Sequence, residues 1–216
     1  MTRGPIVGLL LLLFTLGAAA ATVAQDPGDL LRDAAFVGRF SSLQAEITME
    51  IHDRGSKTRT LELFVEQSPR EQKVLAQVVA PAFLNRMKFL TITGPSRFDQ
   101  WMSTSRGVRR IAQGSRNERL FDSDFTLEDF APPNPDNYEL TVLPDERVDG
   151  ELCHVIRVDP VDIQTDYAYR VIYVSQEDNL LVRAQYFNES DELIRLFELA
   201  DRMTVGGSAF PAQATM

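Results

Sequence analysis

Hydrophobic and polar residues alternate along most of the chain after residue 42. In the run LQAEITMEI, one face carries only apolar side chains, namely Leu43, Ala45, Ile47, Met49 and Ile51. This period of two predicts a β-strand with one face against an apolar surface and the other in water. The run TRTLELFVEQ repeats the alternation after the turn-forming DRGSK, which predicts a hairpin.

Further strands are predicted along the rest of the chain. The runs that carry the signal are EQKVLAQVVA, RMKFLTITG, YELTVL, LCHVIRVDP, YAYRVIYVS, LLVRAQYF and ELIRLFELADRMTV. The segments between the later runs, such as PDERVDGE, QEDN and NESDE, are polar and rich in turn-forming residues. The pattern therefore predicts about nine strands, joined by hairpins into a large antiparallel meander.

Two segments have a helical pattern instead. PGDLLRDAAFVGRF places apolar residues near helical spacing after Asp29, a candidate N-cap; these residues are Leu30, Leu31, Ala34, Val37 and Phe40. TLEDF resembles the first turn of a second helix, which the prolines of APPNPDN would end.

A curved sheet with one apolar face must cover that face. The N-terminal helix and residues 106–137, which interrupt the strand pattern, are the segments available to do so. We therefore predict a mainly β fold: a single curved antiparallel sheet, forming an incomplete β-barrel, with an N-terminal helix and a helical lid over a hydrophobic cavity.

The first 25 residues have the layout of a secretory signal peptide. A basic start at Arg3 precedes an apolar run at residues 6–16 and small residues up to Ala24. An uncleaved N-terminal anchor is the alternative. Because no cysteine follows the apolar run, we expect no lipid to be attached there. Residues 26–216 are expected to form one soluble, exported domain.

Charge and cysteine content exclude two classes of function. Removal of residues 1–25 takes away Arg3 and no acidic residue, so the formal net charge goes from −9 to −10. Such an acidic chain disfavours nucleic acid as a partner. Cys153, in the strand-like run ELCHVIRV, is the single cysteine, so the chain forms neither an internal disulfide nor a cysteine zinc site. We expect Cys153 to be a small buried side chain.

The central region carries an ordered series of motifs. A proline-led loop at Pro81 is followed by a strand ending in LTI, by QWMSTSRGVRRI, by a short serine-rich loop and by SDFTLEDF. This series resembles the outer-membrane lipoprotein-sorting protein (LolA-like) family, in particular the periplasmic branch found with RND-type exporters. The resemblance implies an incomplete antiparallel barrel around a hydrophobic cavity, in a periplasmic carrier of lipid or lipidated cargo. It implies no enzymatic activity and no cofactor.

The end of the chain departs from this pattern. Family members usually continue beyond the position of FPAQATM into one or two closing strands. Either the sequence is a truncated form, or the sheet ends in an open edge, which would favour aggregation.

A carrier needs apolar side chains that face a cavity. The candidates are Ile47, Met49, Leu61, Leu63, Phe89, Trp101, Met102, Phe121 and Phe125, and three tyrosines could join them, Tyr167, Tyr169 and Tyr173. Burial contributes on the order of 25 cal/mol per Å² whether a helix or an acyl chain provides the cover, so core packing is the alternative for each residue. Residues 113–130 would form the lid, with their apolar side chains over the cavity and their acids facing outward.

Three arginines, Arg106, Arg109 and Arg110, flank a tight turn at Gly107 and would lie at the rim of the sheet. Exposed ion pairs with nearby acids are one interpretation. The other is a docking site for an acidic partner surface or a lipid headgroup, because the guanidinium fork matches carboxylates and phosphates. The expected partners are acyl chains, an RND-type inner-membrane exporter and, transiently, a membrane, with no nucleic acid.

No residue pattern is typical of an enzyme. His52 and His154 lie on different predicted strands, outside the known metal and nucleophile motifs. The acids around Phe125 lack the spacing of a calcium loop; these are Asp122, Asp124, Glu128 and Asp129. We therefore expect no catalytic residue, metal or cofactor. A periplasmic stress sensor of the same fold, which binds lipid or peptide and regulates a membrane partner, is the alternative function.

Overall fold

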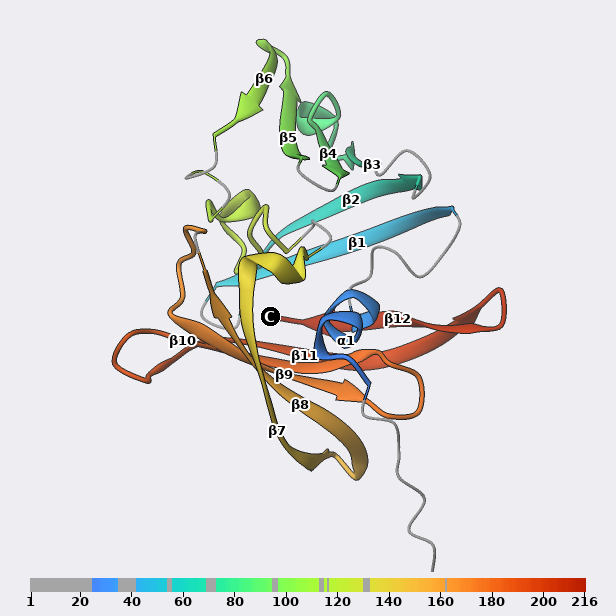
Figure 1. Cartoon of the computed structure of the whole chain (residues 1–216). Coiled ribbons are helices and arrows are strands. Elements are labelled where there is room, and N and C mark those ends of the chain that lie inside the picture. Colours follow the sequence, from blue (N-terminus) through green and yellow to red (C-terminus); the bar gives the residue numbers. More distant parts are fainter. Residues whose placement is uncertain are drawn as a thin grey trace, which may run out of the picture.

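The computed structural model describes residues 25–34, 42–53, 56–68, 73–94, 97–112, 115, 117–129, 133–161 and 163–216. Residues 1–24 of the predicted signal peptide lie outside the described residues. Val37 and Phe40 of the predicted helix also lie outside them. The fold is mainly β, with antiparallel strands and a short N-terminal helix, as the alternation predicts (Figure 1).

The first sheet contains six strands in sequence order, each paired with the next. Its strands are β1 (Leu43–Asp53), β2 (Ser56–Ser68), β3 (Lys73–Ala80), β4 (Lys88–Gly94), β5 (Arg97–Thr104) and β6 (Gly107–Ile111). The predicted β1–β2 hairpin is present, and the tight turn at Gly107 joins β5 to β6 with a φ of 123°, which favours glycine. A short 3₁₀ turn, η2 (Ala82–Leu84), connects β3 to β4.

The second sheet also contains six strands in sequence order. They are β7 (Tyr138–Val148), β8 (Glu151–Pro160), β9 (Tyr169–Ser175), β10 (Leu181–Phe187), β11 (Leu193–Val205) and β12 (Ser208–Thr215). Every neighbouring pair is antiparallel, so this sheet is a second meander.

The predicted single sheet is wrong, because the strands form two sheets. Within the described residues, no ladder joins β6 to β7 or β1 to β12. The chain leaves the first sheet at Ile111 and enters the second at Tyr138, and the segment between them lies between the two sheets in Figure 1. A long connection without strand pairing lets the chain start a new sheet instead of extending the old one.

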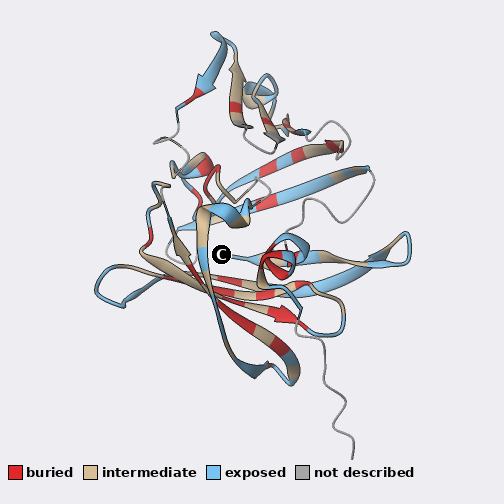
Figure 2. Ribbon diagram, in the orientation of Figure 1, coloured by how far each residue is buried: buried red, intermediate tan, exposed pale blue. Residues whose placement is uncertain are grey.

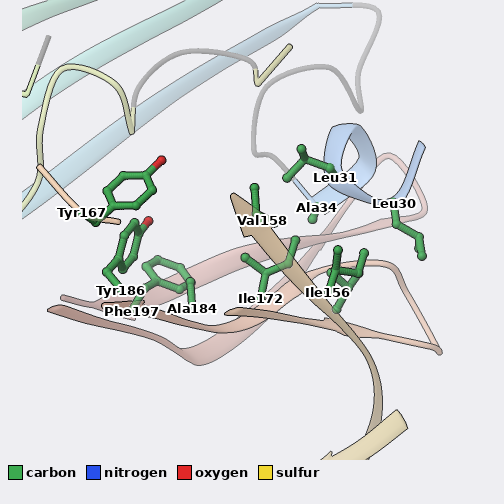
Figure 3. Close-up of a cluster of buried hydrophobic side chains, with 11 residues drawn as sticks. Leu30, Leu31, Ala34, Ile156, Val158, Tyr167, Ile172, Ala184, Tyr186 and Phe197 are labelled. Atoms are coloured by element: carbon green, nitrogen blue, oxygen red, sulfur yellow. The ribbon is translucent and has the colours of Figure 1, made fainter. Parts of the chain in front are cut away.

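Helix α1 (Pro27–Ala34) packs on the second sheet. Its cap is Asp26 rather than the predicted Asp29: Asp26 Oδ1 accepts from the backbone N–H groups of Gly28 (2.8 Å) and Asp29 (3.1 Å). The apolar side of the helix, Leu30, Leu31 and Ala34, is buried. These side chains complete the largest core cluster with Ile156, Val158, Tyr167, Ile172, Val174, Ala184, Tyr186 and Phe197, most of which Figure 3 shows.

Burial is concentrated in the second sheet. Figure 2 shows buried positions gathered on α1 and on the central strands β8 to β11, whereas the first sheet is more exposed. Cys153 is fully buried in a smaller cluster with Val148 and Val182, as expected for a small core side chain, and burial raises the pKa of its thiol. The second sheet and α1 therefore contain the main hydrophobic core. The first sheet buries its apolar side chains with the help of the connection between the two sheets, which packs against it.

Candidate functional site

Residues 117–129, the continuous described stretch of the predicted lid, are called the lid segment below. It is not helical: a 3₁₀ turn, η4 (Leu120–Asp122), is followed by a loop that an isolated bridge between Arg119 and Thr126 closes. Phe121 and Asp122 have positive φ angles of 57° and 62°, which an α-helix cannot accommodate. The predicted helical lid is therefore corrected to an irregular lid.

Side chains within the lid segment stabilise this loop. Ser123 Oγ donates to the Leu120 carbonyl oxygen at 2.7 Å and accepts from the Phe125 N–H at 3.2 Å. Asp129 Oδ2 accepts from the N–H and hydroxyl of Thr126, at 2.7 and 2.9 Å. Such local hydrogen bonds satisfy backbone groups that a helix would otherwise pair, so TLEDF forms a turn rather than the first turn of a helix.

The lid segment packs on one face of the first sheet, which we call the inner face. Leu120 and Leu127 of the lid segment are buried with Ile111 against Phe89 and Met102. Phe121 of the lid segment meets Phe89 edge to face, with ring centroids 5.9 Å apart. Phe121 also contacts the neighbouring cluster of Met49, Leu61, Leu63 and Val78.

Phe125 contacts both sheets. It packs against the cluster around Leu61 on the first sheet and against the large core cluster of the second. The lid segment therefore fills the space between the two sheets, and its apolar side chains cover the inner face. A cavity of about 20 Å³ remains among Leu63, Ala76, Phe89, Leu120 and Leu127. That is room for about one water molecule.

A few polar contacts attach the lid segment to the first sheet. Arg59 Nη1 of β2 donates to the Phe121 carbonyl oxygen at 3.1 Å. The buried Gln100 of β5 donates from Nε2 to the Leu127 carbonyl oxygen at 2.8 Å. Each such bond contributes on the order of 1 kcal/mol, so apolar packing rather than hydrogen bonding holds the lid segment on this face.

The acids at the end of the lid segment do not all face outward, contrary to the sequence prediction. Glu128 Oε1 accepts from the hydroxyls of Tyr138 and Tyr167, each at 3.0 Å. Asp129 has a side chain only 12% exposed and lies 3.8 Å from Arg195 Nη1 of β11. Asp122, with 93% exposure, does face solvent. The last residues of the lid segment are thus attached to the second sheet.

The tyrosines around these acids remain proton donors over a wide pH range. Burial raises the pKa of Tyr186 to about 12 and also raises the pKa values of Tyr138 and Tyr167. Tyr186 donates to Asp129 Oδ1 at 3.4 Å, and its ring contacts that of Tyr167 at a centroid distance of 5.1 Å. At neutral pH these hydroxyls therefore present hydrogen atoms to the lid carboxylates.

The register of the first sheet divides the predicted cargo residues between its two faces. Pairing and contacts place seven of them on the inner face or in the lid segment beside it: Met49, Leu61, Leu63, Phe89, Met102, Phe121 and Phe125. Ile47 pairs with Leu63 and shares this face, at 37% exposure. Trp101 precedes Met102 in β5 and pairs with Leu90, so it lies on the opposite face.

The three predicted docking arginines are exposed but do not share one face. Arg106 lies in the turn between β5 and β6. Arg109 pairs with Met102 and Arg110 with Trp101, so strand alternation directs them to opposite faces. Arg110 forms an ion pair with Asp99. The ion-pair interpretation applies to Arg110, and Arg106 and Arg109 stay candidates for docking.

Sequence reasoning missed Arg170 and Arg195, which lie on the face of the second sheet that bears its core. The signal was present: alternation in YAYRVIYVS places Arg170 on the same face as Ile172 and Val174. An arginine on an apolar strand face is unusual and marks a position with a specific partner. Tyr169 and Tyr173, suggested as cavity residues, alternate with Arg170 and lie on the other face.

Within the described residues, no group of three or more His, Cys, Asp or Glu side chains is placed to bind a metal ion. No described helix is long and apolar enough to cross a membrane. The site consists of an apolar inner face covered by the lid segment, with buried cations and tyrosine hydroxyls where the lid segment meets the second sheet.

Solved structures show the same fold. A DUF1329 family protein from Desulfovibrio piger aligns with a TM-score of 0.74 and 23% identity, over 88% of this chain and 85% of that one. A putative outer membrane lipoprotein-sorting protein domain from Vibrio parahaemolyticus aligns with a TM-score of 0.74 and 17% identity, over 85% of this chain and 79% of that one. A LolA superfamily protein from Nitrosomonas europaea aligns with a TM-score of 0.68 and 17% identity, over 88% of this chain and 84% of that one.

Comparison of the sequence with known proteins identifies one family. No curated protein matches the chain. A protein-family model described as "Uncharacterized protein" matches residues 70–216, more than half of the chain. The chain therefore belongs to the family that this model describes. Its fold is similar to the folds of the three solved structures above.

Proposed function

We propose that this protein is a periplasmic carrier that binds lipid or lipidated cargo between the inner face of the first sheet and the second sheet. One observation carries the proposal: the inner face is covered by the lid segment, an irregular loop whose apolar side chains fill the space that an acyl chain would need. The structure is then the closed form, and cargo enters as the lid segment moves away.

Magnitudes support a reversible exchange. Exposing Leu120, Phe121, Phe125 and Leu127 would cost at most roughly 1.5–3 kcal/mol each, or about 6–12 kcal/mol in total, because the two phenylalanines are only partly buried. A buried methylene contributes about 0.8 kcal/mol, so an acyl chain with about 8 to 15 buried methylenes offsets that cost. Chains of ordinary lipid length fall in or near this range. Because the two terms oppose each other, the net affinity would be much lower than burial of the acyl chain alone would give, as a carrier that must release its cargo requires.

The proposed route is from the inner membrane toward the outer membrane, with an RND-type exporter as partner. The fold supports transport, since one similar structure is a putative lipoprotein-sorting domain. The sequence supports export through the signal-peptide pattern at its start. The proposed role is binding and transport rather than catalysis, because the apolar side chains of the inner face and of the lid segment suit an acyl chain.

The proposed docking surface is one end of the first sheet. The ladders place Lys88 beside Ser103 and Ser103 beside Val108, so the start of β4 and the β5–β6 turn with Arg106 share that end. Phe83 of η2 lies in the connection that leads into β4 and is 81% exposed. Exposed apolar side chains next to cations suit the surface of an anionic membrane.

The cargo site is tested by two neighbouring aromatic residues on opposite faces. Phe89→Gln places a polar group against the lid segment, whereas Trp101→Gln makes a matched change on the other face. Uptake of a fluorescent fatty acid should weaken about tenfold or more in Phe89→Gln and change less than about twofold in Trp101→Gln. Circular dichroism checks that both variants are folded.

Equal uptake by the Phe89 variant and the unmodified protein would contradict the proposed site. Loss of uptake only in the Trp101 variant would move the site to the opposite face of the sheet.

A further inference from the structure

We propose that the second sheet carries a binding site for the anionic headgroup of the cargo, and that Glu128 and Asp129 of the lid segment occupy this site in the closed form. The proposal rests on the proposed carrier function and deepens it, because it assigns a chemical class to the ligand. The ligand is an amphiphile with a carboxylate or phosphate at one end.

The site begins with a row of side chains across the second sheet. The ladders pair Val158 of β8 with Arg170 of β9, Arg170 with Tyr186 of β10, and Tyr186 with Arg195 of β11. Paired residues lie on the same face, so two arginines flank one tyrosine on the face that bears the core. This places two positive charges where the sheet otherwise presents apolar side chains.

Both arginines have a buried nitrogen without a hydrogen-bond partner. Arg170 Nε and Arg195 Nε are each shielded from solvent and unpaired within the described residues. The Arg195 side chain is only 8% exposed. The Arg170 guanidinium lies among three aromatic rings, 5.4 Å from the centroid of Tyr138 and 5.8 Å from those of Tyr167 and Tyr186. Unused donors in a buried position indicate capacity for a further acceptor.

The lid carboxylates lie where the oxygens of an anionic ligand would be bound. Glu128 Oε1 accepts two tyrosine hydroxyls at 3.0 Å each, and Asp129 approaches Tyr186 and Arg195. The two tyrosines that bind Glu128, Tyr138 and Tyr167, are also two of the three whose rings surround the Arg170 guanidinium, which brings Glu128 into the neighbourhood of that cation. Hydroxyls and guanidinium groups that converge on a carboxylate suit any carboxylate or phosphate of similar size.

If the lid segment moved away, Arg195 would keep an acidic partner among the described residues but Arg170 would not. Arg195 would keep Asp166, whose carboxylate is 3.6 Å away on a separate segment. Arg170 would lose Glu128, its acidic neighbour in the closed form. A buried charge without a counterion is strongly unfavourable, so opening is favoured when an arriving anion replaces Glu128.

The surface beside this row suits the remainder of an amphiphile. Two residues along each strand, the next row is apolar and consists of Ile156, Ile172, Ala184 and Phe197. In Figure 3, Tyr167 and Tyr186 lie at one end of this cluster and the leucines of α1 at the other. A ligand with its anion at the arginines could place its apolar chain in the space beside this cluster that Phe125 now fills.

The test compares cis-parinaric acid with its methyl ester, which has the same chain and no charge. The unmodified protein should bind the acid about tenfold or more tightly than the ester, as expected for charge-assisted hydrogen bonds. Glu128→Gln should tighten binding of both probes by a similar factor, since it weakens only the closed form. Adding Arg170→Met to Glu128→Gln removes the cation in a protein that no longer has the Glu128 carboxylate, so no buried carboxylate is left unpaired. In this double variant, the ratio of the affinity for the acid to that for the ester should fall toward one.

A second pair of variants keeps the test decisive if the double variant does not fold. Tyr167→Phe removes one donor to Glu128 and should lower the ratio, whereas Tyr169→Phe removes a hydroxyl that binds Asp191 at 2.9 Å on the other face and should not. Displacement of the probe by lysophosphatidic acid but not by inorganic phosphate would identify the anion as a lipid headgroup. Displacement by inorganic phosphate would contradict a lipid-specific site.

Equal affinity for acid and ester in the unmodified protein would overturn the headgroup site while leaving the carrier function intact. If neither Arg170→Met nor Tyr167→Phe lowered the acid-to-ester affinity ratio, that result would overturn the headgroup site as well. Failure of both probes to bind would instead refute the carrier function on which the site depends.

Discussion

Tyrosine hydroxyls connect the lid segment to the second sheet at the scale of single residues. Tyr138 and Tyr167 bind Glu128, and Tyr186 binds Asp129, in a setting where burial raises all three tyrosine pKa values. The neutral hydroxyl is therefore the form that the folded protein favours. This attachment is insensitive to pH near neutrality and should weaken in alkali.

The sign of this effect follows from the raised pKa of Tyr186. Below about pH 10 both folded and unfolded states keep the proton, so Tyr186 contributes no pH dependence. Between about pH 10 and 12 the unfolded state loses the proton and the folded state retains it, so the free energy of unfolding falls as the pH rises. Tyr186→Phe should reduce this fall, measured by urea unfolding at several alkaline pH values. Identical slopes for both proteins would contradict the assignment.

Neighbouring residues also show what alternation can and cannot predict. The pattern correctly placed Met49, Leu61 and Leu63 on one face of the first sheet. It could also have separated Trp101 from Met102, because adjacent strand residues point to opposite faces. The contact between Tyr167 and Glu128 joins residues 39 positions apart, so spacing alone could not reveal it.

The lid segment is the element that packs against both sheets. Phe125 packs against the clusters of both sheets, and Leu120 and Leu127 cover the inner face. The interrupted strand pattern predicted that this segment would cover the apolar face of a sheet, but not that it would lie between two sheets. Its conformation was not predictable, because positive φ angles at Phe121 and Asp122 and the hydrogen bonds of Ser123 override the helical appearance of the sequence.

Truncation of Phe125 should measure how strongly this element is held. Phe125→Ala removes a partly buried ring from two clusters and should lower the free energy of unfolding by about 2 kcal/mol, less than for a fully buried phenylalanine. The matched control is Phe83→Ala, whose ring is 81% exposed and whose removal should change stability by less than about 0.5 kcal/mol. Urea unfolding measures both. Equal losses would show that the lid segment is not packed as described.

At the scale of the whole molecule, the two sheets have different characters. The second sheet, with α1, holds most of the fully buried side chains, and the first completes its core with the lid segment (Figure 2). The division into two sheets was not predictable, because alternation identifies strands but not which strands pair across a long connection. The hairpins within each sheet were predictable from short turn-forming separators.

The proposed membrane docking concerns the outer surface of the molecule. Arg106→Glu should weaken flotation of the protein with phosphatidylglycerol vesicles several-fold, because each cation near an anionic surface contributes about 1 kcal/mol. Arg110→Glu is a less sensitive control, since Arg110 is already paired with Asp99. Flotation that both variants leave unchanged would remove this end of the first sheet as the contact surface.

The central claim is that the lid segment closes a site for an amphiphile between the two sheets. Hydrogen–deuterium exchange of the purified protein, with and without a saturating fatty acid, tests it most directly. We predict saturable binding of the fatty acid and faster exchange at the backbone amides of Leu120, Ser123 and Phe125, whose hydrogen bonds belong to the closed lid segment. Saturable binding that leaves the exchange of these amides unchanged, or no saturable binding at all, would contradict the claim.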